Sequence, residues 1–309
     1  MAWEPISRCS KWSGTQSPFE VHTIFSQEAL SVGDVLRELD TKSLVRTDFI
    51  LIQGDVVANM DLAKALEAHK DRKTEDKNSI MTMVVKEASP DHQTRGHQDA
   101  IYAINPASQQ CVHFVPSRQG LTTAKSISLS VELLAKHPEL ELRYDLMDCQ
   151  IDICSVEVPA LFTENFDYQD IRRDFVPGIL GSEVLDSTFY VYPITSEYAA
   201  RASSGQLYDA ISRDVISRWT FPMVPDCNLL EDDQYTHQRN LVYKATNVIL
   251  ARTSHLQCNV VIGSRSVVGE HATIAHSVIG RNCRIGNHVT IEGAYLLDGT
   301  VVKDGCQIR

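Results

Sequence analysis

The sequence has few glycines in the region where an enzyme acting on nucleoside phosphates would need them. Only 15 glycines occur in 309 residues, and seven of these lie at positions 263, 269, 280, 286, 293, 299 and 305. Backbone amides approach phosphate oxygens closely only where a Cβ atom is absent, so phosphate-cradling loops depend on glycine. The part of the chain before this late cluster therefore gives little support for a triphosphate-binding loop.

The sequence also lacks an excess of basic residues, long apolar runs and closely paired cysteines. With 29 basic and 40 acidic residues the formal net charge is −11, which disfavours direct binding to nucleic-acid phosphates. No apolar run approaches the roughly 20 residues of a membrane span, and the N-terminus lacks the apolar core of a secretion signal. None of the eight cysteines forms a Cys-x-x-Cys pair, which favours reduced thiols in the cytosol over a disulfide or zinc framework.

The first part of the chain alternates between strand-like and helix-like patterns. Residues 31–40 carry apolar side chains at three- and four-residue spacing, which predicts a helix with one buried face. Residues 48–53 and 79–85 are apolar runs typical of buried central strands, and a helix capped by Asp61 is expected between them. This strand–helix–strand order predicts a parallel sheet with helices on its faces.

Shorter patterns predict the rest of this α/β domain. We expect strands at 21–25, 140–144 and 189–192, a half-exposed strand at 149–154, a hairpin of 99–104 and 111–115, and helices at 158–162, 168–179 and 207–219. The proline-containing stretch 221–225 and the acidic residues 231–233 indicate a linker. We therefore place an α/β domain at residues 1–225 and a linker at residues 226–244.

From about residue 245 the apolar spacing changes to six. The predicted buried positions are Ile262, Val268 and Ile274, then after a step of five Ile279, Ile285, Ile291 and Leu297, and after a second step of five Val302 and Ile308. Glycine or alanine follows most of them, which suits the corner between two sides of a coil. This hexapeptide repeat predicts a left-handed parallel β-helix of roughly three and a half coils over residues 245–309. Because the repeat stops in mid-coil, we expect a truncated or obligate subunit.

An α/β domain followed by a hexapeptide β-helix resembles the nucleotidyltransferase-like family of sugar-nucleotide pyrophosphorylases. Within it, the chain is most similar to the epsilon subunits of the translation initiation factor two-B complex. The stretches that carry this resemblance are SVGDVLRELD (31–40), DFILIQGDVVAN (48–59), NFDYQD (165–170), YDAISRDVISRWTFP (208–222) and VIGSRSVVG (261–269). The fold implied is a Rossmann-like nucleotidyltransferase domain joined to a left-handed β-helix.

The resemblance implies a function in translation initiation. Such a subunit promotes exchange of GDP for GTP on initiation factor two, a G protein, and pairs with a gamma subunit within a complex that also holds alpha, beta and delta subunits. The phosphate-loop segment that opens the domain in this family and the C-terminal domain that catalyses exchange have no counterpart here, so docking and assembly in the cytosol are expected, with no cofactor, metal or membrane partner.

Two positions are candidate sites. Asp55, in the Gly54-Asp55 pair after a predicted strand, stands where a nucleotidyltransferase places a metal-binding carboxylate, but the same pair also suits a turn cap. Without a glycine-rich loop before it, we expect Asp55 to be structural, or at most a vestigial metal or nucleotide site.

The second site is Asn165-Phe166. The residues alone suit a helix N-cap and a core staple. The resemblance instead implies that this pair lies on the face that contacts the G protein, and we expect Asn165 and Phe166 to bind that partner.

Other charged and polar residues indicate no further site. The offsets between His255, His271, His276 and His288 do not place them on one face, and exposed turn histidines are expected. Arg172 and Arg173 are expected to lie on an exposed helix face. The alternatives that stay open are a sugar-1-phosphate nucleotidyltransferase of the mannose-1-phosphate guanylyltransferase type and a structural scaffold without a G-protein partner.

Overall fold

The computed structural model describes residues 20–26, 28–89, 91–95, 100–116, 127–182, 184–228 and 233–309. The chain forms two compact units, an α/β unit of residues 22–208 and a β-helical unit that contains residues 209–309. Each unit has its own hydrophobic core, and we describe them separately. Among the described residues, no helix is long and apolar enough to cross a membrane.

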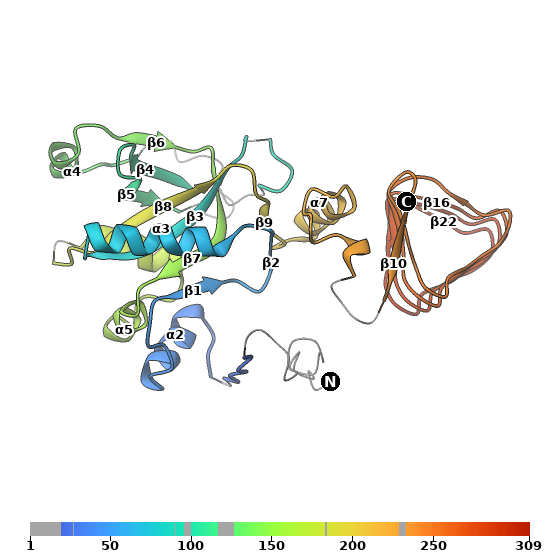
Figure 1. Ribbon diagram of the computed structural model, residues 1–309, viewed down its shortest axis with the longest axis horizontal. Coiled ribbons are helices and arrows are strands. Elements are labelled where there is room, and N and C mark those ends of the chain that lie inside the picture. The colour runs from blue at the N-terminus through green and yellow to red at the C-terminus, as the bar shows by residue number, and fades with distance from the viewer. Residues whose placement is uncertain are drawn as a thin grey trace. The chain divides into compact units, whose positions relative to one another are not determined.

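A seven-stranded mixed sheet forms the centre of the α/β unit (Figure 1). Its strands, in spatial order, are β1 (Phe49–Ile52), β7 (Leu146–Cys154), β3 (Ser79–Glu87), β8 (Thr188–Ile194), β5 (Gln110–Val115), β4 (Ile101–Asn105) and β6 (Glu141–Arg143). Within this sheet only β3 and β8 are parallel neighbours, and the remaining pairs are antiparallel. The predicted 99–104/111–115 hairpin is confirmed as β4 and β5.

The predicted strands at residues 48–53 and 79–85 were expected to pair in parallel, but they are not neighbours in the sheet. Strands β1 and β3 do run in the same direction, as a strand–helix–strand unit requires, but β7 lies between them and is antiparallel to both. Consequently β1, predicted as a central strand, is an edge strand with half-exposed side chains, whereas β7, predicted as half-exposed, is almost entirely buried. The polar residues in β7 suggested exposure because their buried partner, Arg172, lies far away in the sequence.

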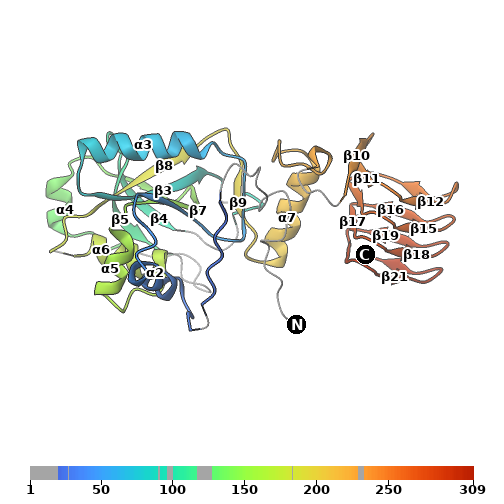
Figure 2. The same cartoon turned by 60° about the horizontal axis from the view of Figure 1, so that its bottom comes forward.

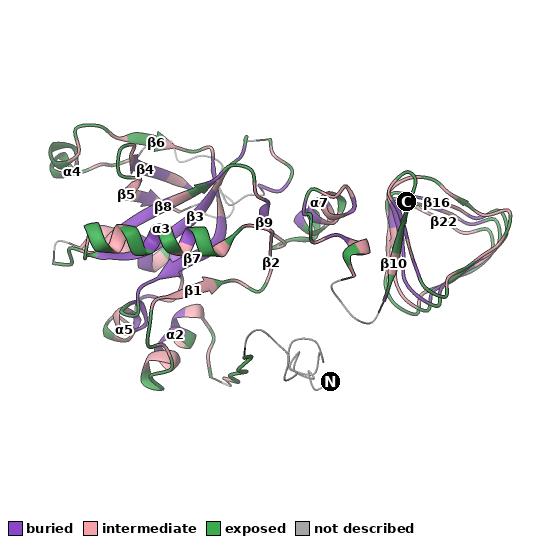
Figure 3. Cartoon of the chain, in the orientation of Figure 1, coloured by how far each residue is buried: buried purple, intermediate pink, exposed green. Residues whose placement is uncertain are grey.

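Helices cover both faces of this sheet (Figure 2). One face carries α3 (Leu62–Glu75), which packs Ala65 against Val84 and Ile151. The other carries α2 (Val32–Thr41), α5 (Val158–Glu164), the π-helix η2 (Ile171–Phe175) and α6 (Val176–Leu180). A further helix, α4 (Val131–Lys136), contributes no buried residue to the core (Figure 3).

Helix boundaries follow the capping residues. Asp61 caps α3 as predicted, and the Ser31 hydroxyl accepts from Asp34 N while the Asp34 carboxylate accepts from Ser31 N, which forms a capping box at α2. The helix expected at 168–179 is shorter, because it begins as the π-helix only after Asp170. Residues 21–25, expected as a strand, form no strand.

The second unit is a three-sided solenoid whose coils stack on one another (Figures 1 and 2). Its strands are β10 (Tyr235–Gln238), β11 (Val242–Ala245), β12 (Ile249–Leu250), β13 (His255–Leu256), β14 (Val260–Ile262), β15 (Val267–Val268), β16 (Thr273–Ala275), β17 (Ser277–Ile279), β18 (Arg284–Ile285), β19 (Thr290–Glu292), β20 (Tyr295–Leu296), β21 (Val301–Val302) and β22 (Gln307–Ile308). They form the sheets β10-β11-β14-β17-β20, β12-β15-β18-β21 and β13-β16-β19-β22. The hexapeptide repeat therefore builds the predicted parallel β-helix.

The register shows where the repeat shortens. Ile262 pairs with Ile279, and Ile279 pairs with Leu296, so each of these coils combines two sides of full length with one shortened side. The step of five thus leads from Ile291 to Leu296, which packs against the core, and not to Leu297 as predicted. Leu297 is 80% exposed, because the shortened side closes the coil one position earlier.

The first coil begins earlier than the repeat suggested. The proposed linker at 226–244 contains the 3-10 helix η3 (Pro225–Cys227) in part, the strand β10 and most of β11. Strand β11 pairs in parallel with β14, so it belongs to the solenoid. Helix α7 (Gly205–Ile216) precedes it, and Tyr243 Oη donates to Ile216 O at 2.9 Å. Of the predicted acidic linker residues 231–233, only Asp233 lies within the described residues.

Close approach of neighbouring coils explains the earlier glycines of the solenoid. A Cβ atom on Gly263 would lie 2.7 Å from the carbonyl carbon of Gly280 one coil later, and the same conflict relates Gly269 to Gly286. Glycine at these corners therefore follows from backbone packing between coils and not from ligand binding.

Candidate functional site

Phe166 projects from the loop between α5 and η2. Asn165 ends α5, and its Oδ1 atom accepts a hydrogen bond from Asp167 N at 3.0 Å. The side chain of Phe166 is 71% exposed. Asn165 is therefore a helix C-cap and not an N-cap, and Phe166 is not a core staple. An exposed aromatic on a turn fixed by an amide is a suitable anchor for a partner.

Arg37 holds this loop in place from helix α2. Its Nη1 atom donates to the carbonyl oxygens of Phe162 and Tyr168, each at 3.1 Å, and its Nη2 atom pairs with Asp34 at 2.8 Å. The guanidinium carbon also lies 5.3 Å from the ring centroid of Phe166. Arg37 is buried, so one cation satisfies two buried carbonyls and supports an exposed aromatic ring.

Gln169 completes the connection between α2 and the loop. Its Nε2 atom donates to Phe166 O at 2.7 Å, and its Oε1 atom accepts from the Ser31 hydroxyl at 2.5 Å. Gly33 N donates to Gln169 O at 3.0 Å. A Cβ atom on Gly33 would lie only 2.2 Å from Tyr168 O, so α2 can approach the loop this closely only with glycine at that position.

A shallow groove of about 520 Å³ opens beside this loop. It is lined by Ala29, Leu30, Ser31, Val32, Val35, Gln169, Asp170 and Arg173. Leu30 and Val35 expose apolar surface in the groove, and Asp170 and Arg173 add one charge of each sign. We name the surface formed by Leu30, Val35, Asn165, Phe166 and Arg173 the α2–α5 surface. Such a mixture of exposed apolar and polar groups is typical of a protein interface.

Asp34 is the charged partner that keeps Arg37 in position. The hydrogen bond from Arg37 is the main cause, with that from Ser31 second, of a lowering of the pKa of Asp34 to about 2. Asp34 is therefore ionised at neutral pH and remains available to Arg37.

Asp55 forms an ion pair with Arg201. Both of its carboxylate oxygens accept from Arg201 Nε, at 2.8 and 3.0 Å, and its backbone oxygen accepts from Ala202 N at 2.8 Å. These contacts join β2 (Val56–Ala58) to β9 (Ala199–Arg201). Among the residues described, no group of three or more His, Cys, Asp or Glu side chains is arranged to hold a metal.

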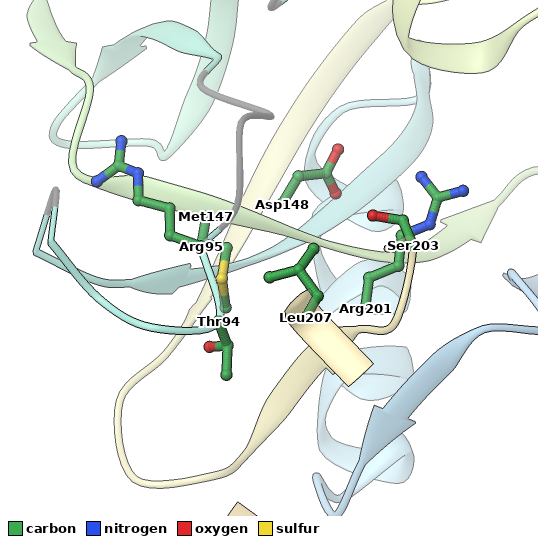
Figure 4. Close-up of a pocket in the computed structure, with 7 residues that line it drawn as sticks. All are labelled: Thr94, Arg95, Met147, Asp148, Arg201, Ser203 and Leu207. Carbon is green, nitrogen blue, oxygen red and sulfur yellow. The ribbon is translucent and has the colours of Figure 1, made fainter. Parts of the chain in front are cut away.

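The cavity beside Arg201 is small. Its volume is about 10 Å³, and Thr94, Arg95, Met147, Asp148, Arg201, Ser203 and Leu207 line it (Figure 4). A cavity of this size has room for about one water molecule. A nucleotide does not fit within it.

A buried charge network lies next to this cavity and was not expected from the sequence. Arg172, predicted on an exposed helix face, is buried, and its Nη2 atom lies 2.6 Å from Asp152 and 3.0 Å from Asp148. Burial raises the pKa of Asp152 to about 6. The network fixes η2 against β7. Arg173 is exposed as predicted, because η2 turns the two adjacent side chains to opposite sides.

His255, His271, His276 and His288 are not buried, in line with the expectation of turn histidines at the surface. His271 and His288 nevertheless share a face, contrary to the sequence-based expectation, and their rings stack with centroids 5.0 Å apart. Their separation along the chain equals one coil, a relationship that becomes visible only when the coil length is known.

Comparison with known proteins agrees with both units. A family model described as "EIF2B subunit epsilon LbH domain" matches residues 239–309. The chain is 50% identical over 262 residues to "Translation initiation factor eIF2B subunit epsilon" of Schizosaccharomyces pombe, which covers 84% of this chain and 38% of that protein. It is 47% identical over 234 residues to the protein of the same name from Dictyostelium discoideum, which covers 75% of this chain and 32% of that protein.

The chain thus spans about a third of the length of these relatives. The aligned region includes most of the described α/β unit and solenoid, because 84% of the chain takes part. At this level of identity over such a length, the chain belongs to the family of eIF2B epsilon subunits.

Proposed function

We propose that this chain is the docking and assembly part of an exchange factor for initiation factor two. In this role it binds the GDP-loaded G protein and holds it while GDP is exchanged for GTP. It pairs with a gamma subunit, joins the alpha, beta and delta subunits, and acts in the cytosol. The names of the two relatives support a translation initiation factor subunit; the division between docking and exchange catalysis is our proposal.

The α2–α5 surface is the observation that carries the docking role. Phe166 exposes its ring to solvent, although the burial of such an aromatic is favourable, and Arg37 and Gln169 hold the loop beneath it. A fixed loop loses little conformational entropy on binding, so more of the free energy gained by burying Phe166 is available for affinity. Asn165 shapes the same turn through its hydrogen bond to Asp167 N.

Two observations support a nucleotidyltransferase-like domain without transferase activity. Arg201 neutralises the Asp55 carboxylate, which an enzyme of this class would offer to a divalent cation. The cavity lined by Asp148 and Arg201 is too small for a nucleotide. In this proposal the sheet serves as a platform for protein contacts.

The solenoid offers a surface for subunit assembly. On the sheet β12-β15-β18-β21, Ile249 pairs with Val267, and the same row continues through Arg284 to Val301. Ile249, Val267 and Val301 are exposed large aliphatic residues. A row of exposed aliphatic residues of this kind suits a subunit contact, and we assign it to the gamma subunit.

The experiment that tests docking is a pull-down of purified GDP-loaded initiation factor two with the chain in complex with its gamma subunit. We expect Phe166→Ala to weaken binding at least tenfold, as for an interface anchor, and Asn165→Ala to weaken it less. The matched control is Tyr144→Ala, which removes another aromatic that is 63% exposed in the same unit. This variant should bind normally.

Gamma-subunit binding is the second readout, since it separates loss of docking from loss of folding. Retention of initiation factor two at the wild-type level by both Phe166→Ala and Asn165→Ala would remove the docking proposal. A sugar-1-phosphate and a nucleoside triphosphate incubated with the same complex test the alternative; pyrophosphate release abolished by Asp55→Asn would establish it.

A further inference from the structure

Three side chains with complementary chemistry meet at one corner of the solenoid. His276 Nε2 lies 3.3 Å from the Sγ atom of Cys258, and His276 Nδ1 lies 3.2 Å from Asn259 Nδ2. The backbone aligns the two coils at this point, because His276 N donates to Cys258 O at 2.8 Å and Ser277 N donates to Asn259 O at 3.0 Å. We name Cys258, Asn259 and His276 the corner triad.

The fold places these residues together for a simple reason. Asn259 and His276 both have left-handed backbone conformations, with φ of +53° and +48°, as the turn at this corner of the coil requires. Asparagine and histidine are among the side-chain-bearing residues that tolerate this conformation best. The stacking of one coil on the next then places His276 directly over Cys258 and Asn259.

The corner triad is open on the side of the next coil. The residue that lies one coil after His276 is Gly293, with φ of +66°, and a Cβ atom added there would have no heavy atom within 4 Å. Gly293 N donates to Ala275 O, which fixes this glycine next to the His276 corner. His276 is exposed and Cys258 is half-buried. Because Cys258 is only half-buried, a small molecule can reach its sulfur from solvent.

The triad places an imidazole nitrogen within hydrogen-bond distance of a thiol. With Asn259 Nδ2 donating to His276 Nδ1, the ring proton resides on Nε2 and points at Sγ, where it stabilises negative charge on sulfur. The thiolate is the nucleophilic form of cysteine. The remaining described cysteines with access to solvent are Cys227 and Cys306, and neither has a hydrogen-bonded imidazole among the described contacts.

We propose that Cys258 is a redox-modification site that reacts with low-molecular-weight disulfides. The thiol proton passes to solvent, the Cys258 thiolate attacks one sulfur of the disulfide, and a new Sγ–S bond forms. The old S–S bond breaks, and the leaving thiolate takes up a proton. Cys258 and the leaving sulfur exchange places in the disulfide, so no further oxidant is needed. His276 stabilises the attacking thiolate, and Asn259 orients the ring.

Other chemistry is less well supported by this geometry. A zinc site needs three or four ligands, and no group of three metal-ligating side chains occurs in the described part of the chain. The surrounding backbone amides of Ser277, His276 and Gly293 already donate to carbonyl oxygens of the coils. They are therefore not free to stabilise an oxyanion, which a hydrolase would require.

The test measures the rate of mixed-disulfide formation at each cysteine. The full chain, reduced and then freed of reductant, is exposed to oxidised glutathione at pH 7, quenched by acid and analysed by peptide mass spectrometry. We expect Cys258 to react at least tenfold faster than Cys227 and Cys306, which serve as reference thiols in the same molecule. Reduction should restore the free thiol.

The decisive variant is His276→Asn, because asparagine tolerates the left-handed backbone at this position. We expect the Cys258 rate to fall at least fivefold, while the rates at Cys227 and Cys306 and the thermal unfolding midpoint stay unchanged. If Cys258 reacts no faster than Cys227 in the wild-type chain, or if His276→Asn leaves its rate unchanged, the proposal is wrong. A general loosening of the coil would instead raise the reactivity of buried Cys283 together with Cys258, and that outcome also contradicts it.

Discussion

The guanidinium carbon of Arg37 lies 5.3 Å from the centroid of the Phe166 ring. These residues are far apart along the chain, and the contact joins helix α2 of the α/β unit to the loop proposed to bind the partner. Because Arg37 also donates to Phe162 O and Tyr168 O, its loss affects both stability and the position of the ring.

Arg37→Ala should lower the free energy of unfolding of the α/β unit by about 2 to 4 kcal/mol, because two buried carbonyl oxygens lose their donor. The control is Arg173→Ala, which removes an exposed arginine from the same unit and should change stability by less than about 0.5 kcal/mol. Urea unfolding followed by fluorescence measures both. Equal stability of the two variants would show that Arg37 does not hold the loop.

Gly33→Ala should also destabilise the α/β unit, by about 1 to 3 kcal/mol. Its Cβ atom would lie 2.2 Å from Tyr168 O, a backbone atom that cannot move without shifting the loop. The matched control is Gly205→Ala in α7, where a Cβ atom meets nothing within 4 Å. Alanine there should be neutral or stabilise the chain by up to about 1 kcal/mol. Thermal unfolding of both variants tests whether α2 approaches the Tyr168 carbonyl as closely as the structure shows.

The stability of the α/β unit should depend on pH through Asp152. Burial raises the pKa of Asp152 from its ordinary value of 3.8 to about 6. A carboxyl group whose pKa is higher in the folded than in the unfolded chain stabilises the fold most when the pH is below its ordinary pKa of 3.8. This stabilisation is lost as the pH rises through the folded-state pKa of about 6. Relative to Asp152→Asn, the wild-type chain should therefore gain about 2 to 3 kcal/mol between pH 7 and pH 4.

Chemical unfolding at both pH values, for the wild type and the variant, isolates the contribution of Asp152 together with its neighbours Asp148 and Arg172, since titrating groups remote from this network affect both proteins equally. Parallel stability profiles for the two proteins would contradict the raised pKa.

The strand register of the solenoid predicts that substitutions at Ile291 and Leu297 have different effects on its stability. Ile291→Ala removes a fully buried side chain and should lower the stability of the solenoid by about 2 to 5 kcal/mol. Leu297→Ala removes a side chain that is 80% exposed and should change it by no more than about 0.5 kcal/mol. Circular dichroism during heating measures both. A large loss of stability for Leu297→Ala would instead indicate that Leu297 is buried, as a regular six-residue step from Ile291 predicts.

The proposed division of labour predicts the exchange activity of this chain alone. If docking and assembly are its role, the chain should bind initiation factor two but accelerate GDP release by less than about twofold. Release of a fluorescent GDP analogue from the loaded G protein measures the rate. Exchange at the rate of the complete complex would show that the chain contains the catalytic element.

The elements that the sequence predicted best are those whose signals are local. The cap at Asp61, the hairpin β4–β5 and the hexapeptide repeat all depend on residues within a few positions of one another. The sheet order was not predictable in this way, because β7 comes from a later part of the chain and inserts between β1 and β3. Apolar runs report burial, but they do not report which strand lies at the edge.

The candidate sites also combine residues that the sequence singled out with contacts that it did not predict. The resemblance suggested Asn165 and Phe166 as a partner site, whereas the residues alone predicted a helix N-cap and a core staple. Neither predicted the support of this loop by Arg37 and Gly33. Asp55 was expected to be structural, but its partner Arg201 could not be named, because the pair depends on β2 meeting β9.

By itself, the sequence determined the α/β and β-helical units and the corner glycines, since a six-residue apolar period is typical of a parallel β-helix. Only the tertiary structure decided that Arg172 is buried between two aspartates and that Cys258 meets His276 one coil later. Both contacts join residues that are distant in the chain, and their geometry is set by how the backbone of one element stacks on another. The stacking determines which side chains lie next to one another, and these neighbours alter the chemistry of each side chain.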